Sequence, residues 1–170
     1  FFSTRRSSDL GGDEAAVSMA HEAGAEPGTG GRDAYRSGDP RRPLAVLAGV
    51  FGALAQLEPT LESPPASFER AGQRVRTPAE GAAHRLGTPL DLALASAAAL
   101  EAAGLHALVF VVEGHAFAGA WLVERTLPAP ATDEPRQVVA RAALTELVAF
   151  DPALAASGGT FEDARAAAHA

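Results

Sequence analysis

The pattern of hydrophobic and polar positions divides the chain near residue 44. Residues 11–43 are rich in Gly, Asp, Glu, Ser and Pro and contain few large apolar side chains. Such a segment buries too little apolar surface to offset the conformational entropy that it loses on ordering. We therefore predict that residues 1–43 are disordered or artefactual and that residues 44–170 form one domain.

The two ends of the chain also bear on this division. Residues 1–10 resemble translated sequencing-adapter text and are left out of the fold prediction. The chain begins with Phe1 rather than Met, and it ends within a helical pattern. We therefore expect a fragment whose C-terminus is cut short.

Three helices are predicted in the first half of the domain. The apolar run over residues 44–57 follows Pro43, a residue favoured in a first helical turn, and predicts a buried helix. A signal peptide is the less favoured alternative, because the preceding region is long and not basic. Residues 77–80 and 88–91 each combine a capping Thr with Pro and an acidic residue, which predicts helices over 77–85 and 88–103.

Three strands and two further helices are predicted in the rest of the domain. The continuous apolar run that ends at residue 112 is typical of a central strand covered on both faces. Glu113 and Gly114 predict a tight hairpin turn, and residues 115–123 predict a second strand with alternating faces. A helix over 136–145, a strand over 147–151 and a final helix from residue 160 complete the pattern. The predicted fold class is α+β, with a central N-capped helix packed on a small antiparallel sheet.

Composition narrows the range of functions. The 170 residues suffice for one domain with a core, and the net charge of -7 with no basic run longer than a pair argues against nucleic-acid binding. The absence of cysteine excludes disulfides, thiolate metal sites and a cysteine nucleophile in this chain. The histidines lack metal-ligand spacing. We predict no cofactor or metal, no membrane span because the apolar runs are too short, and a cytoplasmic location.

Several short motifs, in this order, resemble the bacterial transglutaminase-like domains that often accompany helicase-type proteins. They lie at residues 72–78, 87–94 and 114–119, followed by an Asp at the end of a later strand. The resemblance implies a papain-like core with a Cys-His-Asp site. In that pattern Pro89 holds the nucleophile position, His115 the base position and Asp151 the position of the orienting acid. Gln73 is a candidate oxyanion donor, and its alternative role is that of a loop glutamine that caps backbone groups.

The chemistry of such a site needs all of its parts. A thiolate at a helix N-terminus is the nucleophile, the His moves the proton, and the Asp fixes the His tautomer. Pro89 supplies no nucleophile, and the Thr88 hydroxyl is better explained as a helix cap than as a replacement. The alternative for His115 is a strand histidine satisfied by a neighbouring group. Asp151 followed by Pro is also an ordinary strand-ending turn.

Three functional hypotheses follow from these observations. The first is a catalytically silent transglutaminase-like domain that binds a protein or peptide partner as part of a larger helicase-associated protein. The second is a cysteine-type amide hydrolase or acyltransferase family member whose nucleophile position is lost or misread here. The third is a small scaffold whose motif matches are accidental.

Overall fold

The computed structural model describes residues 2–3, 12–24, 32–63, 75–127 and 131–169. The helices are α1 (Glu14–Glu22), α2 (Arg32–Arg36), α3 (Arg41–Gln56), α4 (Pro78–His84), α5 (Pro89–Ala102), the 3-10 helix η1 (Pro152–Ser157), α6 (Pro135–Ala143) and α7 (Phe161–His169). The strands are β1 (Phe2–Ser3), β2 (Thr60–Leu61), β3 (Leu86–Gly87), β4 (Ala107–Val112), β5 (His115–Trp121), β6 (Ala131–Thr132) and β7 (Leu147–Phe150). The predicted α+β class is confirmed, and each helix and strand predicted from residue 44 onward has a counterpart in the structure.

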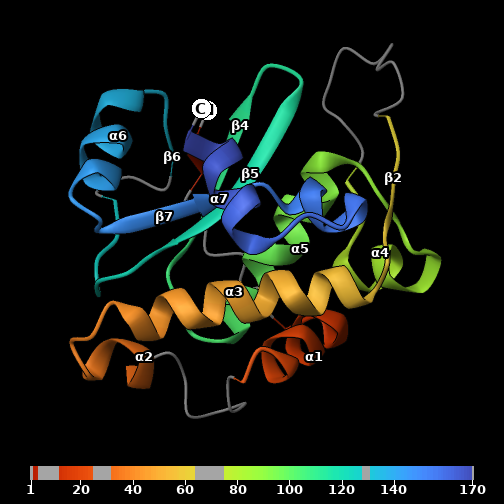
Figure 1. Cartoon of the computed structure of the whole chain (residues 1–170), viewed down its shortest axis with the longest axis horizontal. Coiled ribbons are helices and arrows are strands. Elements are labelled where there is room, and N and C mark those ends of the chain that lie inside the picture. The colour runs from red at the N-terminus through yellow and green to blue at the C-terminus, as the bar shows by residue number, and fades with distance from the viewer. Residues whose placement is uncertain (1, 4–11, 25–31, 64–74, 128–130, 170) are drawn as a thin grey trace.

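The main sheet has the strand order β6-β1-β4-β5-β7, and all its pairings are antiparallel (Figure 1). Its centre is the β4–β5 hairpin, in which Val112 pairs with His115 across the predicted turn. Gly114 has a φ of 75°, a conformation that glycine adopts without steric cost. A second, two-stranded parallel sheet joins β2 to β3, just before α5 begins.

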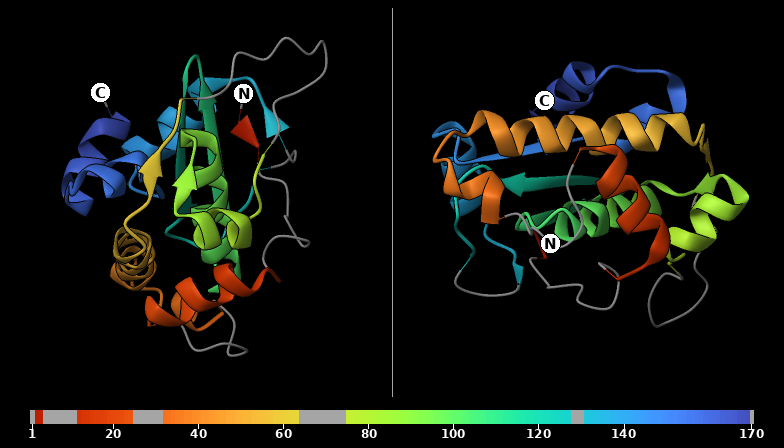
Figure 2. Two further views of the ribbon diagram at one scale, coloured as in Figure 1. Left: turned by 90° about the vertical axis from the view of Figure 1, so that its right-hand side faces the viewer. Right: turned by 90° about the horizontal axis from the view of Figure 1, so that it is seen from below.

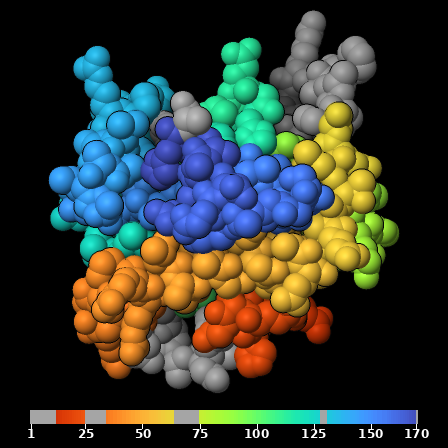
Figure 3. Space-filling model, viewed as in Figure 1, coloured from red at the N-terminus to blue at the C-terminus, as the bar shows by residue number. Residues whose placement is uncertain are grey.

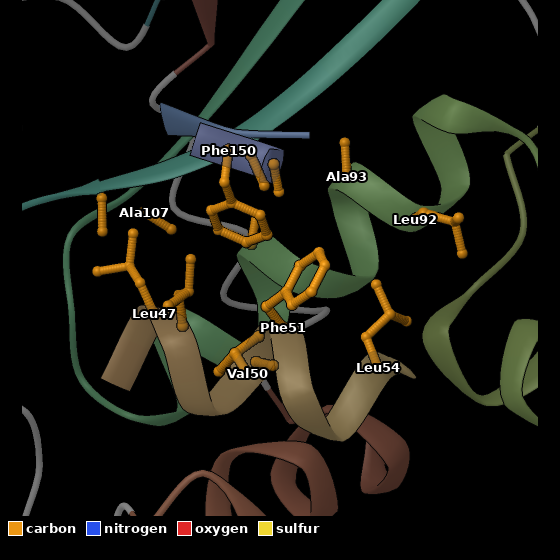
Figure 4. Packing of buried hydrophobic residues seen from close by; sticks show 14 of the residues in the cluster. Leu47, Val50, Phe51, Leu54, Leu92, Ala93, Ala107 and Phe150 are labelled. Carbon is orange, nitrogen blue, oxygen red and sulfur yellow. The ribbon is translucent and has the colours of Figure 1, made fainter. Parts of the chain in front are cut away.

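Helices cover both faces of this sheet, as the alternation of β5 requires (Figure 2). Ala116, Ala118 and Ala120 point to the side of α5 and α3, where they join one hydrophobic cluster. Phe117 and Trp121 point to the opposite side and join a second cluster with α6 and the end of α7. The sheet therefore separates two cores, and the first of them is shown in Figure 4.

The central helix α5 begins and ends where its sequence signals lie. The Thr88 hydroxyl accepts a hydrogen bond from the Asp91 N–H, and the Asp91 carboxylate accepts one from the Thr88 N–H, with Pro89 in the first turn. Gly104, with a φ of 80°, follows its C-terminal end. The alanines of α5 allow α1, α3 and the sheet to approach it closely, so that Ala93 and Ala98 are fully buried.

The segment that composition predicts to be disordered contains two helices, α1 and α2, so the structure differs from that prediction over residues 14–22 and 32–36. Asp13 caps α1, and Ala16 and Met19 are buried where α1 packs on α5 and α3. The reason is that small residues bury area through close contact, which a count of large apolar residues misses. The adapter-like residues lie outside the described part of the chain except at β1.

The contact between Gly49 of α3 and Ala23 at the C-terminal end of α1 gives a test of this packing. A Cβ on Gly49 would meet the backbone of Ala23, whereas a Cβ on Gly52 of the same helix would meet nothing within 4 Å. We expect Gly49→Ala to lower the free energy of unfolding by about 1–3 kcal/mol through overpacking. The matched control Gly52→Ala should raise it by about 0.5–1 kcal/mol, since alanine favours helix. Equal stabilisation by both, measured by urea denaturation, would mean that α1 does not pack on α3.

Tyr35 connects α2 to the sheet through two hydrogen bonds of its hydroxyl group. Its hydroxyl donates to the Trp121 carbonyl and accepts from the His106 N–H, both at 3.0 Å, and its ring stacks on His106. Burial raises the pKa of Tyr35 to about 12. This side chain therefore links the N-terminal segment to the end of β5 and the start of β4.

We expect Tyr35→Phe to lower the free energy of unfolding by about 2 kcal/mol at pH 7, because both backbone groups lose a buried partner. The wild type should also lose stability as pH rises from 10 toward 12, since Tyr35 ionises first in the unfolded chain. The phenylalanine variant should lack this part of the alkaline loss. Denaturation at pH 7 and at pH 11 measures both effects, and a difference below about 0.5 kcal/mol at pH 7 would show that water replaces the two bonds.

Candidate functional site

The structure brings together two of the predicted site residues, His115 and Asp151. His115 is the first residue of β5, Asp151 follows β7, and the two strands are neighbours in the sheet. The His115 Nε2 lies 2.9 Å from the Asp151 Oδ2, and the side chains are 30% and 12% exposed. Nε2 has no aligned hydrogen-bond acceptor among the described residues, so the contact is a close approach of the two atoms rather than a linear hydrogen bond.

Backbone contacts fix the Asp151 side chain. Its Oδ1 accepts from the Ala153 N–H at 2.9 Å, which caps η1, and its own N–H donates to the Ala164 carbonyl in α7. One oxygen of the Asp151 carboxylate therefore belongs to the strand-ending turn, and the other lies close to Nε2 of His115.

Pro89 lies at the first position of α5, half-buried, and offers no atom that could attack a carbonyl. The neighbouring Thr88 is 2% exposed, and its hydroxyl is engaged with the Asp91 N–H at 3.2 Å. This geometry fits the capping interpretation of Thr88 rather than a nucleophilic one. The N-terminus of α5 is therefore well formed but carries no nucleophile.

Pro89 and His115 lie toward the same end of the sheet. Helix α5 is 14 residues, or about 21 Å, long and turns back into β4 through only a few residues, so its first turn lies toward the end at which β5 begins. The His115 ring lies on the side of β5 that carries Phe117, with ring centroids 4.8 Å apart, whereas α5 packs on the other side. The structure thus brings His115 close to Asp151, while α5, which begins at Pro89, packs on the other side of the sheet.

Arg76 and Asp91 form a network at this end that the sequence reasoning did not assign. The buried Asp91 accepts from the Arg76 N–H at 2.9 Å and pairs with its guanidinium at 3.1 Å. The guanidinium also pairs with Glu62 at 2.7 Å, which links β2 to the start of α5. The sequence did offer one signal for this network, because Arg76 and Asp91 lie in two of the motifs that carry the family resemblance, at residues 72–78 and 87–94. Gln73 lies outside the described residues.

Burial by itself would raise the pKa of Asp91, but the hydrogen bonds from Thr88 and Arg76 outweigh it and hold that pKa below its usual value. The carboxylate is therefore ionised at neutral pH and orders three segments around the first turn of α5. Its role is to position this end of the helix.

No family model, curated protein or solved structure matches the chain. Within the described residues, none of the helices combines the length and apolar character needed to cross a membrane, and no three potential metal-ligating side chains gather into a cluster.

Proposed function

We propose that this chain is a catalytically silent transglutaminase-like domain that binds a protein or peptide partner and belongs to a larger helicase-associated protein. One observation carries the proposal. His115 and Asp151, distant in sequence, meet at 2.9 Å, while the helix N-terminus at the same end of the sheet carries Pro89. This contact supports the proposal, because a His beside an Asp is the arrangement of a base and its orienting acid, and Pro89 offers no nucleophile for them to serve.

The chemistry explains why such a site would be silent. The base acts by taking a proton from the nucleophile and returning it to the leaving group, and Pro89 has neither a side-chain proton nor a lone pair to offer. What remains is a partly exposed imidazole beside a carboxylate, which can hydrogen-bond a peptide. The net charge of -7 favours a basic partner segment over nucleic acid.

The second candidate is a cysteine-type amide hydrolase or acyltransferase family member whose nucleophile position is lost or misread. The intact His115–Asp151 contact favours it, because selection would not maintain the two residues in contact if the pair had no function. Resequencing the parent gene at codon 89 separates the two candidates. A Cys codon would support the second candidate, and a Pro codon would support the first.

A peptide array tests the binding function. We expect the wild-type domain to bind a subset of array peptides, and His115→Ala to lose about tenfold or more in affinity for them in solution titrations. The matched control is His84→Ala, which removes an exposed imidazole in the last turn of α4. Acyl transfer from a glutamine peptide to hydroxylamine should stay at background in both variants and in wild type. Peptide binding that survives His115→Ala, or turnover that depends on His115, would contradict the proposal.

A further inference from the structure

A cavity of about 390 Å³ lies on the side of the sheet opposite to α5. Its floor is formed by Phe110, Phe117 and other residues of β4, β5 and β7, and α6 and the end of α7 form its walls. In Figure 3 these two helices, in light and dark blue, lie beside each other on the visible face, above α3. The cavity is therefore bounded by five elements that are distant in sequence.

The lining of this cavity is apolar. Val138, Val139 and Ala142 of α6 face Phe110, Val112 and Phe117 of the sheet, and His169 supplies the only ionisable side chain among the described lining residues. Val112 and Val139 are 45% and 64% exposed, so they form the rim of an opening to solvent. Polar groups that could hold ordered water are scarce here, and apolar cavities of this kind accept apolar guests.

The space exists because alanines lie where the elements meet. Ala142, Ala149 and Ala168 come from α6, β7 and α7, and each contributes only a methyl group to the walls. The rigid β4–β5 hairpin and the pairing of β5 with β7 hold the floor in place, so the walls cannot collapse onto it. The volume of about 390 Å³ is large enough for a small-molecule guest.

We propose that this cavity is a binding site for a small apolar molecule, either an aliphatic chain or an aromatic ring system of that size. Its volume falls within the range of small-molecule pockets, which is roughly 300–1,000 Å³, and its apolar lining fits their usual composition. The inference does not depend on the proposed peptide-binding function. The two sites are nevertheless adjacent, because the Phe117 ring lines the cavity and also contacts the His115 ring.

The chain contains a natural reporter for this site. Trp121 is the only tryptophan, it is 1% exposed, and it belongs to the hydrophobic cluster that underlies the cavity. Trp121 does not itself line the cavity, but it pairs across the sheet with Leu147, which does. A brominated guest quenches tryptophan fluorescence at short range, so bromoundecanol serves as the probe and undecanol as its competitor. Saturable quenching of Trp121 by bromoundecanol, reversed by undecanol, is the expected result for the full chain.

Two matched substitutions on α6 make the test specific. Ala142→Phe fills the cavity and should weaken the apparent affinity for bromoundecanol about tenfold or more, whereas Ala140→Phe, at an exposed position outside the cavity, should leave it unchanged. If Ala142→Phe fails to fold, Val139→Asp places a charge on the exposed rim and should weaken binding similarly. Absence of quenching, or equal quenching in all variants, overturns the proposal. So does a dimer in sedimentation that Val139→Asp dissociates without a change in quenching, because the cavity then faces a second copy.

Discussion

Replacing Asp91 by Ala is expected to lower the free energy of unfolding at pH 7 by about 3 kcal/mol or more. The carboxylate is 5% exposed and accepts hydrogen bonds from the Thr88 N–H, the Arg76 N–H and the Arg76 guanidinium. Its removal deletes the half of the α5 capping box in which the Thr88 N–H is satisfied, and it leaves Arg76 with Glu62 as its remaining ion-pair partner among the described residues. Urea denaturation of the wild type and the variant measures the loss.

The matched control is Glu62→Gln, which alters the other carboxylate that contacts Arg76. Glu62 is 38% exposed at its side chain, so water can replace much of its interaction, and the expected loss is below about 1 kcal/mol. Similar losses for the two variants would show that Arg76, rather than the cap of α5, accounts for the effect of Asp91.

The same carboxylate makes the stability difference depend on pH. Hydrogen bonds hold the pKa of Asp91 below its ordinary value, so the unfolded chain takes up a proton first as pH falls. The contribution of Asp91 is therefore complete above the unfolded pKa of about 3.9 and is lost as pH falls through the lower folded pKa. The difference between wild type and Asp91→Ala should be constant from pH 5 to pH 8 and shrink below about pH 4. A difference that stays constant down to pH 2 would mean that the pKa of Asp91 is the same in the folded and the unfolded chain.

The elements of the domain could be predicted because their signals are local. The capping boxes at Thr77 and Thr88 and the Glu113–Gly114 turn each fix a boundary within a few residues of sequence, and all three boundaries are found in the structure. The alternation of β5 likewise assigned Ala116 and Phe117 to opposite faces, and they belong to different hydrophobic clusters.

The features that the sequence did not reveal depend on contacts between distant segments. Helix α1 is held by the fit of Ala16 and Ala23 to α5 and α3, and Tyr35 reaches the sheet from a segment that composition suggests is disordered. The network of Arg76 and Asp91 and the apolar cavity likewise arise only when several elements meet. The sequence pattern does not show which distant segments pack together. Small side chains permit close packing, but the sequence alone does not identify the segment that packs against them.

The geometry of the candidate site also depends on contacts between distant segments. The resemblance proposed His115 and Asp151, and the contact between them depends on the pairing of β5 with β7, which the strand signals alone do not specify. Whether Pro89 belongs to the same site depends on how the first turn of α5 approaches the end of β5. A thiol placed at residue 89 can report on that approach.

Pro89→Cys is expected to yield a thiol whose pKa is at least about one unit below the free value of 8.5. Two causes are proposed, namely the helix dipole at the first turn of α5 and the imidazole of His115 at the same end of the sheet. The pH dependence of the rate of alkylation by iodoacetamide gives the pKa, and the wild-type chain contributes no background because it lacks cysteine.

Two further variants separate the causes. Pro135→Cys places a thiol at the first turn of α6, a helix of 9 residues whose N-terminal proline is exposed, and it measures the effect of a helix end in the absence of the His115–Asp151 pair. We expect the thiol at residue 89 to have a lower pKa than the thiol at residue 135, and His115→Ala to remove that difference. If the two thiols titrate alike and His115→Ala changes neither, the imidazole does not face the first turn of α5. The transglutaminase-like proposal would then lose its main support. The proposal of an apolar binding site in the cavity would be unaffected.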